Sequence, residues 1–135
     1  MTPEELAAFA KEAMERAYAP YSNCKVGAAL LCADGTVYQG CNIENSSFSA
    51  SVCAERVAFF KAVSDGKSVF SAIAVCGGKN GVISYSFPPC GVCRQVMTEF
   101  CDSDLQVYFV KPDSIEKHTL GELMPFVFTK KNIFD

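Results

Sequence analysis

Three cysteines in two short segments constrain this chain most strongly. The segment S-V-C-A-E-R carries Cys53 and Glu55, and the segment P-C-G-V-C-R-Q carries Cys90 and Cys93. Each segment opens a helical pattern, which predicts Cys53 in the first turn of one helix and the other two cysteines in the first turn of another. Helix N-termini carry partial positive charge and free N–H groups, which stabilise thiolates. A fold that joins these two helix ends can therefore hold one metal ion.

Zinc is the metal that this set of sulfur atoms favours. Three protein ligands leave the fourth position of a tetrahedral site open to water, which is typical of a catalytic site. Glu55 lies two residues after Cys53, so both side chains can reach a point beyond the helix end. A carboxylate there can take a proton from water and later return it. Arg56 is the first candidate to offset the negative charge of three thiolates, and Arg94 is a second.

Other interpretations of these cysteines remain open. A C-x-x-C pair alone is more often a structural zinc knuckle, a redox pair or two buried thiols. A closed structural site needs a fourth ligand, and Cys101 and His118 could supply one, although neither has knuckle-like spacing. The eight cysteines could instead form a disulfide scaffold. A core-forming composition without an export signal favours reduced thiols.

Length and charge narrow the class of protein. A chain of 135 residues, 50% of them hydrophobic, predicts one domain spanning residues 1–135. The net charge of -3 and the absence of a Lys and Arg stripe exclude polymeric nucleic acid as the expected partner. The apolar runs are too short to cross a membrane, and the first residues do not form a secretion leader. We expect a cytoplasmic protein without a membrane anchor.

Hydrophobic periodicity predicts an α/β fold. Helices are expected over 3–17, from Ser49 or Ser51 as the cap to about Asp65, and over about 91–100, and strands over 26–33, 36–41, 69–76 and 105–110, with a loop over 77–89. Asp34-Gly35 predicts a hairpin between the first two strands. We therefore expect a three-layer sandwich, with a mixed sheet of about five strands flanked by helices and helical crossovers linking its later strands.

The chain resembles the short, tetrameric cytidine deaminases of the three-cysteine zinc class over nearly its whole length. The segments Y-A-P-Y-S, V-G-A-A-L-L, G-C-N-I-E-N, C-A-E-R and P-C-G-V-C-R-Q occur in the order typical of that family. Zinc deaminases combine such a P-C-x-x-C with a glutamate that is not a metal ligand. The resemblance implies hydrolysis of cytidine and 2'-deoxycytidine to uridine and 2'-deoxyuridine with release of ammonia, in pyrimidine salvage. It also implies one Zn2+ per subunit, held by Cys53, Cys90 and Cys93, with Glu55 moving protons.

Substrate-binding residues also follow from the resemblance. It places Asn42, Ile43 and Glu44 at the sugar, where an amide and a carboxylate can bind hydroxyl groups. It implies that Phe48 and Phe128 are aromatic residues lent between subunits of a homotetramer. Ordinary core packing is the alternative for both phenylalanines. A negative Glu44 near the sugar would favour small nucleosides over nucleotides.

Several positions depart from the pattern of the family and leave the substrate range open. Cys24 stands where a phenylalanine is usual, Pro88 replaces a common serine, and Phe126-Val127 replaces a small pair. One alternative is a deaminase of another small cytosine-containing molecule, such as an aminoacyl-nucleoside antibiotic or the free base. A second is a non-catalytic zinc-stabilised binding module, and a third is a domain that edits RNA or DNA.

Overall fold

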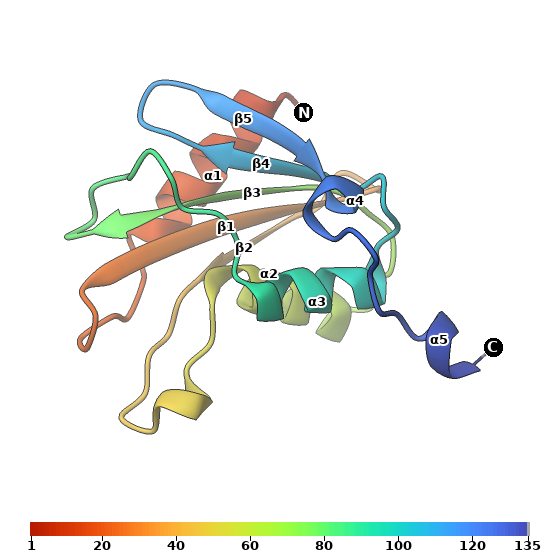
Figure 1. The fold of residues 1–135 in the computed structure, drawn as a ribbon. Helices are drawn as coiled ribbons and strands as arrows, with labels where there is room; N and C mark the ends of the chain where they lie inside the picture. Colours follow the sequence, from red (N-terminus) through yellow and green to blue (C-terminus); the bar gives the residue numbers. More distant parts are fainter. Residues whose placement is uncertain (135) are drawn as a thin grey trace.

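The computed structural model describes residues 1–134, so Asp135, the last residue of the expected domain, lies outside the described residues. A mixed five-stranded sheet forms its centre, in the order β2-β1-β3-β4-β5 (Figure 1). This confirms the predicted α/β class and the number of strands. The strands are β1 (Cys24–Cys32), β2 (Val37–Cys41), β3 (Phe70–Lys79), β4 (Gln106–Val110) and β5 (Ile115–Thr119), and the helices are α1 (Pro3–Met14), η1 (Phe48–Ala50), α2 (Ala54–Ser64), α3 (Gly91–Phe100), α4 (Leu120–Leu123) and α5 (Lys131–Phe134).

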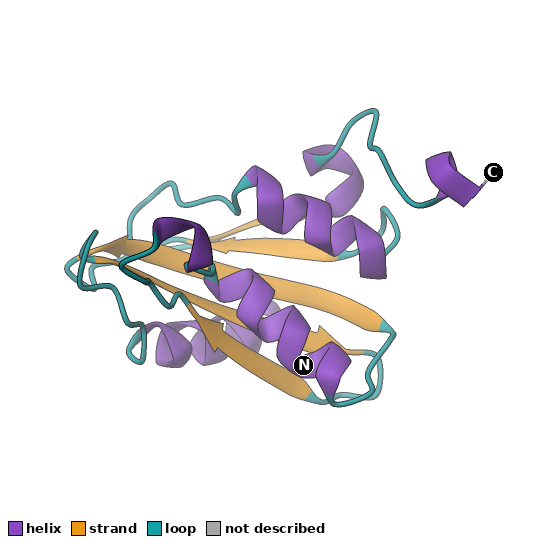
Figure 2. Ribbon diagram, turned by 90° about the horizontal axis from the view of Figure 1, so that it is seen from below, coloured by secondary structure: helices purple, strands orange, loops and turns teal. Residues whose placement is uncertain are grey.

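The sheet is covered on both faces, as the expected three layers require. Helix α1 packs on one face through an apolar stripe that includes Leu6 and Ala10, against Ala74 and Cys76 of β3. Helices α2 and α3 pack on the other face, where Phe59 contributes to a larger core (Figure 2). A hydrophobic face on each element must be buried against another element, and alternate strand residues supply the two faces.

The predicted hairpin joins β1 and β2, which pair antiparallel. Gly35 has a φ of +91°, a value that glycine adopts without strain. Asp34 supports the turn, because its carboxylate accepts a hydrogen bond from the Thr36 N–H at 3.0 Å. The Asp34-Gly35 signal in the sequence therefore marked the true turn.

The connection from β3 through α3 to β4 brings the two cysteine segments together. Strands β3 and β4 are parallel neighbours, so the helix between them must return across one face of the sheet. Helix α2 crosses the same face before β3 begins (Figure 1). The N-termini of α2 and α3 consequently lie at the same end of the sheet.

Two predicted boundaries differ by three residues from the structure. Helix α1 ends at Met14 and not at 17, because Tyr18 must already be extended to pair with Ile43. Strand β3 continues to Lys79, through Gly77 and Gly78, which the sequence placed in a loop. Pairing with β1 satisfies the backbone of these glycines, which have low strand propensity of their own.

The C-terminal region contains elements that the sequence did not predict. Strand β5 pairs antiparallel with β4, so this last connection is a hairpin and not a helical crossover. The tail after α4 leaves the body of the molecule and ends in the short helix α5, which stands apart in both views (Figures 1 and 2). Among residues 1–134, every helix is too short or too polar to span a bilayer.

Candidate metal centre and active site

The Sγ atoms of Cys53, Cys90 and Cys93, here called the cysteine cluster, lie within 4.8 Å of one another. Cys90 Sγ is 3.8 Å from Cys53 Sγ and 3.4 Å from Cys93 Sγ. Two sulfur atoms bonded to one tetrahedral zinc ion are about 3.8 Å apart. The cluster therefore matches the spacing of a zinc site, as the sequence predicted.

Helix capping positions these sulfur atoms. Cys53 is the N-cap of α2 and Cys90 is the N-cap of α3, while Cys93 lies in the first turn of α3. The prediction that Ser49 or Ser51 caps α2 was wrong, because these residues belong to the 3-10 turn and its end. An N-cap side chain lies beside the free N–H groups of the helix start, and a thiolate is stabilised there.

The thiols of Cys53 and Cys93 differ in acidity. Hydrogen bonding from Cys93, and then the Arg56 guanidinium, lower the pKa of Cys53 to about 5. The same hydrogen bond raises the pKa of the Cys93 thiol, which is also buried. Cys53 therefore loses its proton before Cys93, and a metal ion would favour the loss of the remaining protons.

Glu55 is buried next to the cysteine cluster. Its side chain is 3% exposed, and its Oε1 atom has no hydrogen-bond partner. Burial raises the pKa of Glu55 to about 7, against the opposing effect of its own backbone N–H. A buried carboxyl oxygen without a partner is costly to maintain, so a water or ligand group is the natural occupant of the space before it.

The two arginines near the cluster have different contacts. Arg56 Nη2 donates to Cys53 Sγ at 3.4 Å, the position expected of a cation that offsets thiolate charge. Arg94 instead donates from Nε to the Pro89 carbonyl at 2.9 Å and from Nη1 to the Leu123 carbonyl at 3.2 Å. Arg94 thus ties the segment before Cys90 to the end of α4.

A fourth protein ligand is not found near the cluster in the described part of the chain. Neither Cys101 nor His118 belongs to it. His118 is instead bound to Glu116 and Glu122. This geometry leaves one corner of a tetrahedral site free for water or substrate. All eight cysteines are free thiols in the structure.

A cavity of about 510 Å³, here called the site cavity, opens beside the cluster. Asn42 and Glu44 line it together with Cys53 and Glu55. The Asn42 side chain accepts from the Val26 N–H at 2.8 Å and donates to the Cys24 carbonyl at 2.8 Å. These bonds fix the amide and leave one N–H and one lone pair for a ligand.

Glu44 is held just as firmly. Its Oε1 accepts hydrogen bonds from the backbone N–H groups of Tyr21 at 2.9 Å and Ser22 at 3.1 Å. The Ser22 hydroxyl donates to the other oxygen and is the main cause of the lowered pKa of Glu44. The carboxylate therefore presents a fixed negative charge to the site cavity.

The remaining residues expected at the substrate are distributed differently. Phe48 lines the site cavity of its own chain, and its ring is 73% exposed. Ile43 does not line this cavity, because its backbone N–H and carbonyl pair with Val52. Phe128 lies outside the cavity too, and its side chain is 61% exposed.

Five further residues line the site cavity without having been predicted there: Ser22, Val26, Ser51, Val52 and Phe87. Cys24 and Pro88, noted in the sequence as departures from the family pattern, also line it. Only the order of strands in the sheet shows that the start of β1 lies beside the segment before Cys90. No local motif in the sequence carries that information.

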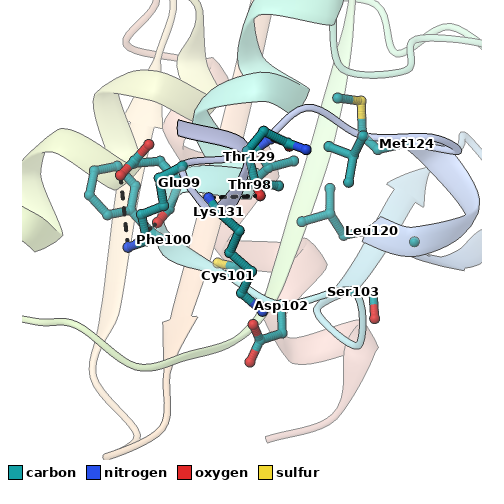
Figure 3. A pocket seen from close by; sticks show the side chains of 14 residues that line it. Thr98, Glu99, Phe100, Cys101, Asp102, Ser103, Leu120, Met124, Thr129 and Lys131 are labelled. Atoms are coloured by element: carbon teal, nitrogen blue, oxygen red, sulfur yellow. Dashed lines mark hydrogen bonds and ion pairs between the residues drawn. The ribbon is translucent and has the colours of Figure 1, made fainter. Parts of the chain in front are cut away.

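A second hollow lies beneath the tail and shares no residue with the site cavity. Its volume is about 840 Å³, and the ends of α3 and α4 and the tail form its walls (Figure 3). Lys130 forms an ion pair with Glu99 there at 3.8 Å. This larger hollow lacks the cysteine cluster and Glu55, so we place the chemistry in the smaller one.

Two helix starts that bring three sulfur atoms and a buried carboxylate together beside one cavity are typical of an enzyme with a catalytic zinc ion. The sequence model described as "Cytidine and deoxycytidylate deaminase zinc-binding region" matches residues 1–109. The chain belongs to this deaminase family, and zinc is its cofactor.

Relatives cover nearly the whole chain. A cytidine deaminase of Sporosarcina psychrophila is 51% identical over 134 residues, which are 98% of this chain and 96% of that protein. A cytidine deaminase of Halalkalibacterium halodurans is 46% identical and covers 92% of each chain. The crystal structure of cytidine deaminase from Burkholderia pseudomallei superposes with a TM-score of 0.86 at 44% identity, and the match covers 95% of this chain and 100% of that one.

Proposed function

We propose that the protein hydrolyses the exocyclic amine of cytidine and 2'-deoxycytidine, and that Cys53, Cys90 and Cys93 hold the zinc ion. Water adds to C4 of the pyrimidine, the bond from C4 to the amine breaks, and uridine or 2'-deoxyuridine and ammonia result. The observation that carries this proposal is the unpaired, buried carboxyl oxygen of Glu55 beside the three sulfur atoms. Relatives named cytidine deaminase, at up to 51% identity, support it.

Proton transfer is the role that we assign to Glu55. When bound, zinc supplies a Lewis acid that makes a water molecule acidic enough to react near neutral pH. Glu55 takes one proton of that water and passes it to N3 of the ring, and it then carries the second proton, from the hydroxyl added at C4, to the departing amine. Because Glu55 is walled off from bulk solvent, the protons it carries are delivered within the cavity.

The opposite side of the site cavity suits a sugar. The fixed amide of Asn42 and the ionised carboxylate of Glu44 can together donate to and accept from ribose hydroxyls. The negative charge of Glu44 repels a phosphate at that end. We therefore propose a preference for nucleosides over nucleotides, while Ile43 acts through its backbone by holding this strand end in place.

We further propose assembly into a homotetramer with shared sites, which the exposed aromatic residues support. Phe126, Phe128 and Phe134 of the tail are exposed by 61% or more, and Phe48 is exposed at the mouth of the site cavity. Large apolar side chains that are this exposed are costly in water and are common at subunit interfaces. We further propose that residues 1–135 act as one domain. The free cysteines fit a reducing compartment such as the cytoplasm.

The test measures zinc content and the loss of ultraviolet absorbance of cytidine on the same purified sample. The native protein should bind about one zinc per chain and turn over cytidine, and Glu55→Gln should lose about 100-fold or more in kcat while it keeps its zinc. Glu99→Gln, on the surface of α3 away from the site cavity, serves as the control. A zinc-loaded Glu55→Gln protein with native kcat would refute the proposed role.

The same assay separates the alternatives. Cytosine, deoxycytidine monophosphate and an aminoacyl-nucleoside should each react more slowly than cytidine. A zinc-replete protein that turns over none of these compounds would instead be a binding module. A shift of labelled RNA or DNA at physiological salt would indicate an editing domain.

A further inference from the structure

Phe87 contributes an aromatic side chain to the site cavity that the proposed mechanism leaves unused. It precedes the zinc ligand Cys90 by three residues and lines the same cavity as Glu55. Phe87 is half-buried and packs against the core beneath α2 and α3. Phe48, the other aromatic residue in this wall, is mostly exposed. Phe48 contacts Tyr21 edge-on but is not packed into the core, so Phe87 offers the more firmly held of the two aromatic rings in the described wall.

The Phe87 ring packs on Gly77, which has no side chain. A Cβ atom added to Gly77 would lie 2.7 Å from the ring, so the ring packs directly on the backbone of β3. Gly77 is paired with Val26 across the sheet, and directly paired residues face the same side. Val26 and Cys24, two residues apart on β1, therefore share that side with the ring. The small Cys24 side chain leaves the space next to the ring open to a ligand.

The segment between β3 and α3 holds the Phe87 ring against Gly77. The Ser84 N–H donates to the Gly77 carbonyl at 2.9 Å, and the Ser84 hydroxyl donates to the Ser86 carbonyl at 2.8 Å. A Cβ atom on Gly78 would lie 1.8 Å from the Val82 carbonyl oxygen, so the segment folds directly onto the strand. The ring is thus held before any ligand arrives, which lowers the entropic cost of binding.

We propose that Phe87 is a specificity-determining residue that stacks on the pyrimidine ring, in place of an aromatic residue at position 24. The proposal rests on the proposed function, which places the reacting carbon at the cysteine cluster and Glu55 and the sugar at Asn42 and Glu44. The base must then span the part of the cavity that Phe87 borders. A planar base gains from such a wall because aromatic faces attract each other when offset or edge-on.

The first experiment compares Phe87→Leu with Tyr85→Leu. Leucine keeps an apolar side chain but removes the aromatic face, so Phe87→Leu should raise the KM for cytidine about 3- to 10-fold. Its kcat should stay within about twofold, because the ring does not touch the transferred protons. Tyr85 belongs to the same segment but is 64% exposed and does not line the cavity, so Tyr85→Leu should leave KM unchanged. Equal zinc contents would exclude damage to the metal site.

A second measurement separates stacking from simple packing. Inhibition by uridine, which has a planar ring, should weaken more in Phe87→Leu than inhibition by 5,6-dihydrouridine, whose ring is saturated and puckered. Phe87→Tyr keeps the ring and should restore native values. Gly77→Ala should reproduce the KM effect by displacing the ring while Phe87 remains.

An unchanged KM in Phe87→Leu, or equal losses for the planar and the puckered inhibitor, would overturn the proposal. These results differ from a failure of the proposed function, in which the native protein itself would not deaminate cytidine.

Discussion

At the scale of single residues, Arg56 shows how charge at the cysteine cluster can be tested. Three thiolates and Zn2+ sum to a net negative charge, which weakens the metal as a Lewis acid. Arg56 lies 3.4 Å from Cys53 Sγ and offsets this charge. We expect Arg56→Gln to lower kcat about 10- to 100-fold in zinc-loaded protein. The kcat of Arg56→Lys, which keeps the charge without the planar guanidinium, should lie between those of the native protein and Arg56→Gln.

Metal analysis by mass spectrometry, together with the cytidine assay, checks this prediction. A native kcat in zinc-loaded Arg56→Gln would show that the positive charge of Arg56 does not affect the rate.

The residues closest to the chemistry could be predicted because short motifs carry them. Cys53 and Glu55 belong to one segment of four residues, and Cys90 and Cys93 belong to another, so helix geometry alone places each pair. Phe87 and Ser22 could not be found in this way. Their place in the site cavity depends on how β3 pairs with β1, which no local pattern specifies.

At the scale of elements, Gly40 sets the position of α2. A Cβ atom there would lie 2.3 Å from the Ala54 carbonyl oxygen and 2.6 Å from the Ala58 nitrogen, in the first turns of the helix. Gly40→Ala should therefore push α2 away from β2 and lower the free energy of unfolding by about 2 kcal/mol. Because α2 carries Cys53 and Glu55, zinc affinity and kcat should fall as well.

The control is Gly91→Ala, since a Cβ atom on Gly91 meets open space. Urea unfolding of the two variants should show a loss of stability in Gly40→Ala alone, and equal stabilities would contradict this account.

His118 links β5 to α4 and makes this junction sensitive to pH. It is the one histidine of the chain. Hydrogen bonds that His118 donates to Glu116 first and then to Glu122 raise the pKa of His118, and the same bonds lower the pKa values of both carboxyls. The histidine contribution to stability is complete below its unfolded pKa of about 6.5 and is lost as pH rises through the raised value. The carboxyl contributions are lost on the acid side, as pH falls through their lowered values.

The comparison of native protein with His118→Gln tests this junction. The native protein should lose stability between pH 6 and pH 8 relative to His118→Gln, measured by urea unfolding at both values. The subtraction cancels the pH dependence of zinc binding, which both proteins share. A constant difference in unfolding free energy across this range would contradict the prediction.

Elements with strong periodicity were easier to predict than elements defined by their partners. The sequence placed α3 at its observed bounds, Gly91–Phe100, and identified the hairpin at Asp34-Gly35. Strand β5 was missed because I-E-K-H-T is polar, and its pairing with β4 stabilises it at the edge of the sheet. Propensity alone is weak at such an edge, where the partner decides the conformation.

At the scale of the whole molecule, the three layers could be predicted from the sequence, but the surface that the tail after α4 contacts could not. Hydrophobic periodicity indicates which face of an element is buried, and this was enough to predict the sheet and the helices that cover it. Phe126, at a φ of +53°, is fully exposed and Phe128 is 61% exposed in their own chain, so we expect another chain to cover them. This leads to a test of site sharing that needs no structure of the assembly.

Two impaired variants should complement each other if Phe128 serves the site of a neighbouring subunit. Glu55→Gln lacks the proton carrier, and Phe128→Ala lacks the lent aromatic ring, so each alone should be slow at low cytidine concentration. In a 1:1 co-expressed mixture, a site is intact when its own chain keeps Glu55 and its neighbour keeps Phe128. Random assembly gives each condition half the time, so about a quarter of the sites recover. Activity equal to the mean of the two parents would show that each site is built from one chain, while recovery toward a quarter would show that the tail completes the neighbour.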